Sequence, residues 1–160
     1  CEAGVNFNFN EHNILKPDFT KPMTPHFELD NNVIIFSLFP GIEEHLIHHM
    51  FDAPELRSIV MRSYGSGNAP QYPWLMDLLR KVSERDIIVV NISQCISGQV
   101  EMNRYDTGYQ LKDAGVISGF DSTVEAAVTK LMYLQAKYKD STTIRKYMNQ
   151  SIAGEITVFC

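Results

Sequence analysis

The sequence has 160 residues but only three cysteines and no long apolar run. The cysteines, at positions 1, 95 and 160, lack the paired spacing of a disulfide framework or a zinc site, so a reducing cytoplasm suits them best. The longest apolar stretches, 33–39 and 87–90, are too short to cross a bilayer. The sequence shows no basic segment followed by an apolar one, which is the pattern of a secretory leader. We therefore expect a cytoplasmic protein that has no membrane partner.

Positive charge is also limited. The chain contains 14 Lys and Arg against 19 Asp and Glu, which gives a formal net charge of -5. The basic residues are scattered and form no run that could follow a phosphate backbone, so we expect no nucleic-acid partner. The first residue is Cys1 and not methionine, from which we expect that the chain was processed or excised from something longer.

Short apolar runs and amphipathic segments alternate along most of the chain, which is 44% hydrophobic. A chain of this length can bury one compact core and still carry an appended segment. The alternation of strands and helices predicts an α/β fold, a three-layer Rossmann-like domain with a mostly parallel sheet. Strands are predicted over 33–39, 58–63 and 87–92. Two helices are predicted to begin at residues 42 and 73, and three more are predicted over 105–114, 122–137 and 142–149.

The two ends of the chain depart from this alternation. Residues 1–10 alternate apolar and polar side chains, which predicts a strand. Residues 11–32 are polar and contain three prolines, which disfavour helix and predict a linker. A last strand is predicted over 155–159. A capping box at Ser122–Glu125 is predicted to open the helix over 122–137.

Three histidines, His45, His48 and His49, fall in the helix predicted from residue 42. Two histidines four residues apart can hold a metal ion on one helix face. The helical period nevertheless turns His45 and His49 away from the apolar side, so we expect both to be solvated and predict no metal site. The predicted inner side of this helix consists of Ile42, Leu46, Ile47 and Met50.

A glycine-rich turn follows the second predicted strand, where ligands of parallel sheets commonly bind. Gly65 and Gly67 let backbone N–H groups approach a ligand closely, Arg62 offers a fork suited to a carboxylate, and Asn68 offers a donor and an acceptor. The alternative is that the glycines only turn the chain. A dinucleotide site is disfavoured, because Pro70 stands where its third glycine would be.

The loop after the third predicted strand contains Ser93 and Cys95. A cysteine at a strand end can act as a nucleophile, but it needs a positioned base, and all five histidines lie between residues 12 and 49. We therefore favour a buried structural or ligand-contacting thiol at Cys95. Structural roles in caps and turns are also favoured for four carboxylates that could serve acid and base chemistry, Asp106, Asp113, Asp121 and Glu125.

Three stretches in consistent order resemble the C-terminal domain of bacterial cytoplasmic, type I L-asparaginases. They are Arg62–Pro70, Asn91–Gly98 and Tyr105–Glu125 with its Gly-Val-Ile-Ser-Gly-Phe-Asp core, and Phe39-Pro40-Gly41 resembles that family's entry to the domain. The resemblance covers roughly 33–155. It implies that residues 1–32 are the end of an N-terminal domain and an interdomain linker, and that 33–160 form the C-terminal α/β domain.

The resemblance implies that the parent protein hydrolyses the side-chain amide of L-asparagine to aspartate and ammonia with a threonine nucleophile and no metal or cofactor. The family's Thr-Gly-Gly-Thr and His-Gly-Thr-Asp stretches lie in the N-terminal domain, and neither string occurs here. This chain is therefore expected to contain no catalytic residue and to be inactive alone. The implied partners are L-asparagine, the chain's own N-terminal domain and further copies in a dimer or tetramer.

Some members of the family bind asparagine at a second, allosteric site, and the positions that match that pocket are Arg62, Asn68, Ser93 and Cys95, beside backbone groups near Gly65. Asn68 alternatively serves a neighbouring subunit's active site. Two other interpretations stay open: a self-contained small-ligand-binding module of Rossmann-like fold, and a fragment of a glutaminase-asparaginase or of an archaeal-type tRNA-dependent amidotransferase subunit. The sequence does not separate a preference for asparagine from one for glutamine.

Overall fold

The computed structural model describes residues 2–9, 11, 14, 16–96, 98–102 and 106–157. A four-stranded parallel sheet runs in the order β3-β4-β5-β6, which confirms the predicted mostly parallel α/β fold. Its strands are β3 (Val33–Ser37), β4 (Ser58–Ser63), β5 (Ile88–Ser93) and β6 (Ile117–Ser118). The short strand β6 had not been predicted, since two residues are too few to show a period of two.

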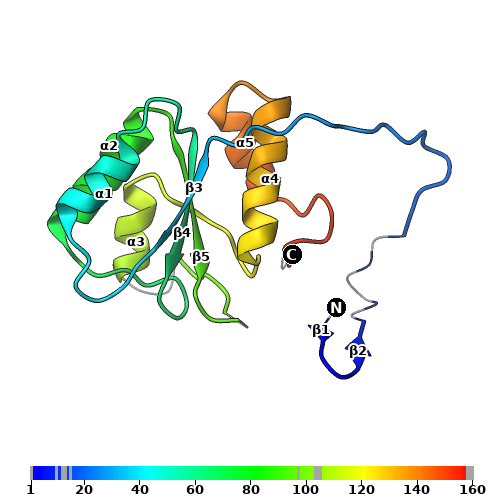
Figure 1. The fold of residues 1–160 in the computed structure, drawn as a ribbon, viewed down its shortest axis with the longest axis horizontal. Coiled ribbons are helices and arrows are strands. Elements are labelled where there is room, and N and C mark those ends of the chain that lie inside the picture. The colour runs from blue at the N-terminus through cyan, green and yellow to red at the C-terminus, as the bar shows by residue number, and fades with distance from the viewer. Residues whose placement is uncertain are drawn as a thin grey trace.

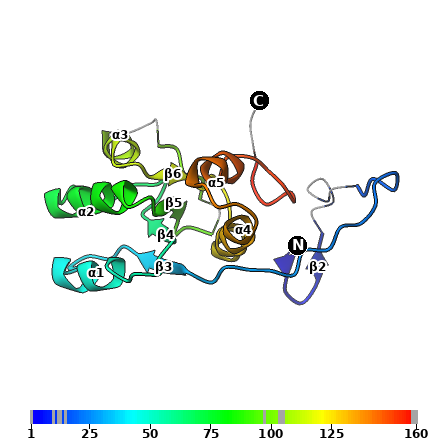
Figure 2. The same ribbon diagram turned by 90° about the horizontal axis from the view of Figure 1, so that it is seen from above.

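Helices cover both faces of this sheet. Figures 1 and 2 show α1 (Glu44–Phe51), α2 (Pro73–Glu84) and α3 (Asp106–Asp113) on one face, and α4 (Val124–Lys137) and α5 (Ser141–Met148) on the other. Ile59 and Met61 of β4 belong to the core under α1, α2 and α3, whereas Val60 belongs to the core under α4 and α5. Alternate residues of β4 therefore face opposite layers, as the pleat of a strand requires.

Helix α1 buries only part of the predicted inner side: Ile47, and Ile42 just before the helix, are buried as predicted. Ile47 and Phe51 are buried, whereas Leu46 and Met50 are 55% and 40% exposed. Residues four apart share one side of a helix, so Ile47 and Phe51 together set the rotation of α1 against the sheet. The predicted solvation of His45 and His49 agrees with their exposed positions.

Two predicted end signals also differ in the structure. The cap of α4 is Thr123, one residue later than predicted, and its hydroxyl accepts a hydrogen bond from the Ala126 N–H at 3.2 Å. Residues 155–157 form no strand, because the Glu155 side chain turns back to accept backbone N–H bonds from Ile152 and Ala153. Residues 158–159 of the predicted strand lie outside the described residues.

The N-terminal arm, defined here as residues 2–29, extends away from the sheet and its helices (Figure 1). Its first part is a hairpin of β1 (Glu2–Ala3) and β2 (Phe7–Asn8) and not the single predicted strand, because the chain turns at Gly4. The arm joins the body at Asp30, whose N–H donates to the Met132 carbonyl and whose carboxylate lies 2.7 Å from the Arg57 guanidinium. No helix in the described residues is both long and apolar enough to span a bilayer.

Candidate functional site

The glycine turn, residues 64–68, lies at the carboxyl end of β4. Its two ends pair with each other, since the Tyr64 N–H donates to the Asn68 carbonyl and the Asn68 N–H to the Tyr64 carbonyl, at 2.9 and 2.8 Å. Gly65 and Gly67 have φ angles of 51° and 105°, which glycine adopts without steric cost. A Cβ at Gly67 would lie 2.8 Å from Val100 Cγ1, so the backbone packs too closely there for a side chain.

All three central carbonyl groups of the glycine turn accept hydrogen bonds from neighbouring segments. The Ser93 hydroxyl donates to Gly65 O at 2.6 Å, the Glu101 N–H to Ser66 O at 3.0 Å, and the Asn91 amide to Gly67 O at 3.0 Å. The N–H groups of Gly65 and Ser66 have no hydrogen-bond partner within the described part of the chain. The backbone of the turn thus presents donors and keeps its central carbonyls occupied, an arrangement that suits an anionic or carbonyl oxygen.

The backbone and the side chain of Arg62 have different surroundings. Its carbonyl accepts from the Leu38 N–H and from the Gln94 side chain, at 3.0 and 2.9 Å, which ties the ends of three strands together. No described residue forms a hydrogen bond or an ion pair with its guanidinium group, and the Nε atom is buried. Because Arg62 follows Val60 by two residues, its side chain leaves the sheet on the α4 side.

Ser93 and Cys95 lie close to the glycine turn. The Ser93 hydroxyl donates to Gly65 O and accepts from the Cys95 N–H at 3.0 Å, so the structure brings Gly65, Ser93 and Cys95 together. Cys95 itself is exposed, and the interpretation as a buried thiol is wrong. The strand ends at Ser93, and the chain then turns outward, where the Gly98 N–H donates to Cys95 O.

Asn68 lies at the far end of the glycine turn and is held by helix α3. Its Oδ1 atom accepts a hydrogen bond of 2.9 Å from the Thr107 hydroxyl in the first turn of that helix. Its Nδ2 group donates to no residue in the described ranges, so a donor remains for another molecule. The predicted residues therefore form two groups, with Arg62 on one face of the sheet and the turn residues with Ser93 at its end.

Three residues that hold this edge together were missed in the sequence. Gln94 donates to the carbonyls of Leu38 and Arg62, at 2.7 and 2.9 Å, and Asn91 is fully buried beneath Gly67. The polar Asn91 within the apolar strand was a signal for a buried hydrogen bond. Thr107 had no such signal, because its contact with Asn68 spans 39 positions along the chain.

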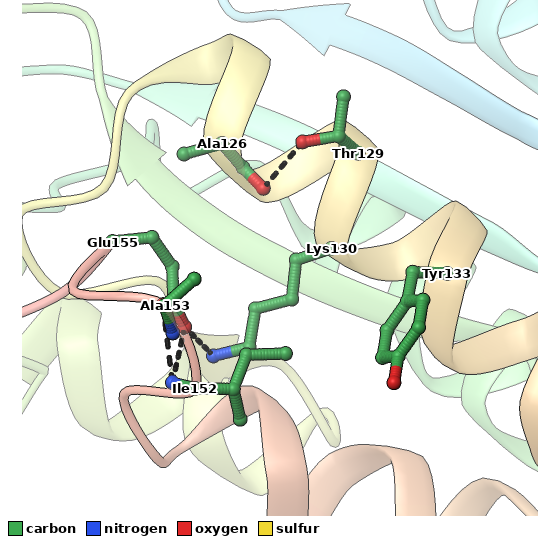
Figure 3. Close-up of a pocket in the computed structure, with 7 residues that line it drawn as sticks. All are labelled: Ala126, Thr129, Lys130, Tyr133, Ile152, Ala153 and Glu155. Atoms are coloured by element: carbon green, nitrogen blue, oxygen red, sulfur yellow. Dashed lines mark hydrogen bonds and ion pairs between the residues drawn. The ribbon is translucent and has the colours of Figure 1, made fainter. Parts of the chain in front are cut away.

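A cavity of about 450 Å³ lies elsewhere, between α4 and residues 152–155, and none of the predicted site residues lines it. Figure 3 shows Lys130 reaching from α4 toward Glu155, with Ile152 and Ala153 beside the pair. The Lys130 ammonium lies 2.5 Å from the Glu155 carboxylate, 2.5 Å from Gln150 O and 3.2 Å from Met148 O. Its three protons therefore have three acceptors.

This Lys130–Glu155 pair is almost completely buried, with side-chain exposures of 3% and 11%. Burial lowers the pKa of Lys130, although the bond to Glu155 opposes that change. Burial alone would raise the pKa of Glu155, but hydrogen bonds from Lys130 and from backbone N–H groups outweigh it and lower that pKa. The pair fastens the segment after α5 to α4, and we call it the C-terminal latch.

Metal ligation finds no support in the described residues, where no group of three or more His, Cys, Asp or Glu side chains could hold an ion. His48 instead lies 3.4 Å from Glu44, one turn earlier on α1. The sheet edge offers backbone and amide donors, the Ser93 hydroxyl, the exposed Cys95 thiol and a guanidinium group without a partner among the described residues.

Comparison with known proteins shows the family to which this domain is similar. The family model described as the glutaminase/asparaginase C-terminal domain matches residues 32–148. The chain is 43% identical over 136 residues to L-asparaginase 1 of Escherichia coli (strain K12), covering 85% of this chain and 38% of that protein. It is 36% identical over 156 residues to the 60 kDa lysophospholipase of Homo sapiens, covering 97% of this chain and 27% of that protein.

The fold agrees with a solved structure as well. The crystal structure of L-asparaginase I from Vibrio cholerae O1 biovar eltor superposes with a TM-score of 0.76 at 40% sequence identity. The match covers 81% of this chain and 39% of that chain. The chain thus spans about two fifths of the length of these asparaginases.

Proposed function

The chain belongs to the family of glutaminase/asparaginase C-terminal domains, and we propose that it is the C-terminal domain of an amidohydrolase that converts L-asparagine and water to L-aspartate and ammonia. The family match over residues 32–148 carries this proposal. The L-asparaginase 1 relative, of which the chain covers 38%, supports it. We further propose that the protein works in the cytoplasm, which is also what the small number and wide spacing of its cysteines predict.

The chain's share of this activity is assembly and ligand contact and not bond cleavage. An activated hydroxyl nucleophile needs a general base, yet the Ser93 hydroxyl donates its proton to the Gly65 carbonyl. We therefore expect the isolated chain to release no ammonia from L-asparagine. A steady release by the pure chain, above that of a heat-inactivated sample, would refute this assignment.

The proposed binding surface is the carboxyl edge of β4 and β5. Arg62 would hold the α-carboxylate of asparagine through two parallel hydrogen bonds. The Asn68 Nδ2 group and the N–H groups of Gly65 and Ser66, for which the described ranges offer no partner, would donate to the ligand's other oxygen atoms. Ser93, whose proton is already committed, would accept from the ligand's ammonium group. A ligand that lies across the strand ends would reach both the Arg62 side and the turn side.

We propose two uses for this surface in the parent protein, which we expect to be a dimer or tetramer. The first is an effector site, at which asparagine changes the activity of a distant active site. The second is completion of a neighbouring subunit's active site by Asn68. The two uses differ in kinetics, because an effector site gives a sigmoidal response to asparagine, whereas an active-site role changes the reaction at every concentration.

Titration of the parent protein with L-asparagine tests the proposal, with wild type compared with Arg62→Ala. The substitution removes the proposed carboxylate contact, and we expect the asparagine response to move to concentrations about 10- to 100-fold higher. L-Glutamine, assayed in parallel, reports the amide preference. Identical asparagine binding and response in both proteins would overturn the ligand site but leave the family assignment intact.

A second candidate activity follows from the relative named 60 kDa lysophospholipase, which matches 97% of this chain. The same domain type therefore occurs in a protein with a different named activity. The parent should be assayed against a lysophospholipid as well as asparagine. Release of fatty acid without release of ammonia would favour this second candidate over the first.

A further inference from the structure

Asn68 can present either end of its amide to a ligand, and the choice decides which ligand atom it recognises. The Oδ1 end is an acceptor and would select an ammonium or amide N–H, whereas the NH2 end is a donor and would select a carboxylate or carbonyl oxygen. Asn68 stands at the end of the glycine turn and is half-buried. The group that fixes its amide therefore controls specificity at this position.

Thr107 is the residue that contacts this amide. Its hydroxyl donates to Asn68 Oδ1 at 2.9 Å. Thr107 is held in place by close packing of the next residue, since a Cβ at Gly108 would collide with the backbone of Met102. Helix α3 therefore brings the hydroxyl to the amide along a backbone that has little room to shift.

The rest of the glycine turn has the same polarity. Its carbonyls at Gly65, Ser66 and Gly67 all accept hydrogen bonds from other segments. The backbone N–H groups of Gly65 and Ser66 are without a partner among the residues described. With Oδ1 of Asn68 occupied as well, the backbone and amide groups of the turn that lack a partner among the described residues are donors, whereas the Ser66 hydroxyl can donate or accept.

We infer that Thr107 is a positioning residue that fixes the Asn68 amide with its NH2 group outward, so that this position accepts a carboxylate or carbonyl oxygen of the ligand and rejects a donor. This inference rests on the proposed amino-acid site and deepens it. Thr107 touches no ligand atom in this scheme. It acts only through Asn68, and the two residues form one unit.

The test uses the full-length parent protein with Thr107→Val, which keeps the shape and removes the hydroxyl, and with Thr107→Ser, which keeps the hydroxyl. Without the hydroxyl the amide turns freely, and we expect the apparent Kd for L-asparagine to rise about three- to tenfold in Thr107→Val. Thr107→Ser should restore binding to near the wild-type value. An unchanged Kd in Thr107→Val would overturn the inference.

A double-mutant cycle separates action through Asn68 from a general effect on α3. Thr107→Val should change the Kd in the wild-type background and leave it unchanged in the Asn68→Ala background. An effect of equal size in both backgrounds would show that Thr107 acts on the helix and not on the amide. Circular dichroism melting of each variant controls for folding.

Asn68→Asp tests the polarity directly. The carboxylate can still accept from Thr107, but it presents an acceptor in place of the NH2 group, so asparagine binding should fall below that of Asn68→Ala. Binding as tight as wild type in Asn68→Asp would refute the donor role. If Asn68→Ala, Asn68→Asp and Arg62→Ala all bind asparagine like wild type, the proposed site itself is wrong; if only the Thr107 variants are silent, the site stands and this inference fails.

Discussion

The carboxyl edge of the sheet and the C-terminal latch both contain a basic side chain with little exposure to solvent, but they use it differently. Lys130 of the latch has an acceptor for each of its three protons. Arg62 at the edge has no partner for its guanidinium group among the described residues, and its Nε atom is buried. Removal of one member of a buried ion pair strongly destabilises a fold, whereas a half-buried guanidinium group without a partner costs stability and can bind an anionic group of another molecule.

The same contrast holds for the neutral groups around each site. At the latch, the backbone carbonyls at 148 and 150 bind the ammonium, and the N–H groups at 152 and 153 bind the carboxylate. At the edge, the carbonyls of the glycine turn are bonded, but the N–H groups of Gly65 and Ser66 have no partner among the residues that the structure describes. The comparison predicts that substitutions at the latch change stability, and that substitutions of the unpaired edge groups change binding.

The largest effect on stability is expected for Lys130→Met. Removal of the ammonium leaves the Glu155 carboxylate buried without its counter-ion, which should lower the free energy of unfolding by about 3–5 kcal/mol. Urea unfolding followed by circular dichroism measures the change. Lys81→Met, at an exposed position near the end of α2, is the matched control and should stay within about 0.5 kcal/mol of wild type. Equal effects of the two substitutions would show that the latch does not hold the fold.

The next largest effect is expected where a side chain is added to the glycine turn. Gly67→Ala adds both a strained φ of 105° and a collision with Val100, so we expect a loss of about 2–3 kcal/mol. Gly65→Ala adds a strained φ of 51° but no contact within 4 Å, so we expect about 1 kcal/mol. Thermal melting of both variants measures the difference. A larger loss for Gly65→Ala would contradict the packing of Gly67 against Val100.

The elements of the body could be predicted from the sequence because each is specified locally. The predicted strand over Ser58–Ser63 has the bounds of β4. The helix predicted to begin at Pro73 has the first residue of α2. The parallel sheet follows from their alternation with helices. The rotation of α1 was predicted only in part: Ile47 was expected to be buried, but only packing against the sheet selects Phe51 over Leu46 and Met50 as its buried neighbour.

The residues proposed for the site can be picked out in the sequence, but the contacts between them cannot. Arg62, the glycines and Asn68 are recognisable as a run along the chain, Cys95 follows a strand end, and the resemblance to a family adds Ser93 and assigns them to one pocket. The side of the sheet to which Arg62 points depends on register, and the bond from Thr107 to Asn68 joins segments 39 positions apart. Such contacts depend on the folded chain and leave no periodic pattern in the sequence.

The pH dependence of stability should distinguish the latch from the edge more finely. The pKa of Glu155 is lowered in the folded protein, so its contribution to stability is fully present above the unfolded pKa and is lost as the pH falls through the lower, folded pKa. Asp30, beside Arg57, has a lowered pKa and contributes with the same sign. We therefore expect Glu155→Gln to lose less stability than wild type between neutral and acidic pH. Parallel acid profiles for the two proteins would exclude the lowered pKa of Glu155.

The smallest effect on stability is expected for Arg62→Met, at the edge. Methionine keeps the length of the apolar stem and removes an unpaired guanidinium group, so the free energy of unfolding should stay within about 1 kcal/mol of wild type or rise slightly. The same substitution in the parent should weaken asparagine binding about 10- to 100-fold, measured by calorimetry. Lys130→Met should show the reverse, with stability lost but asparagine affinity kept at temperatures where the protein is folded. If Arg62→Met unfolds the chain as Lys130→Met does, the guanidinium has a structural partner, and the distinction between an open edge and a closed latch does not hold.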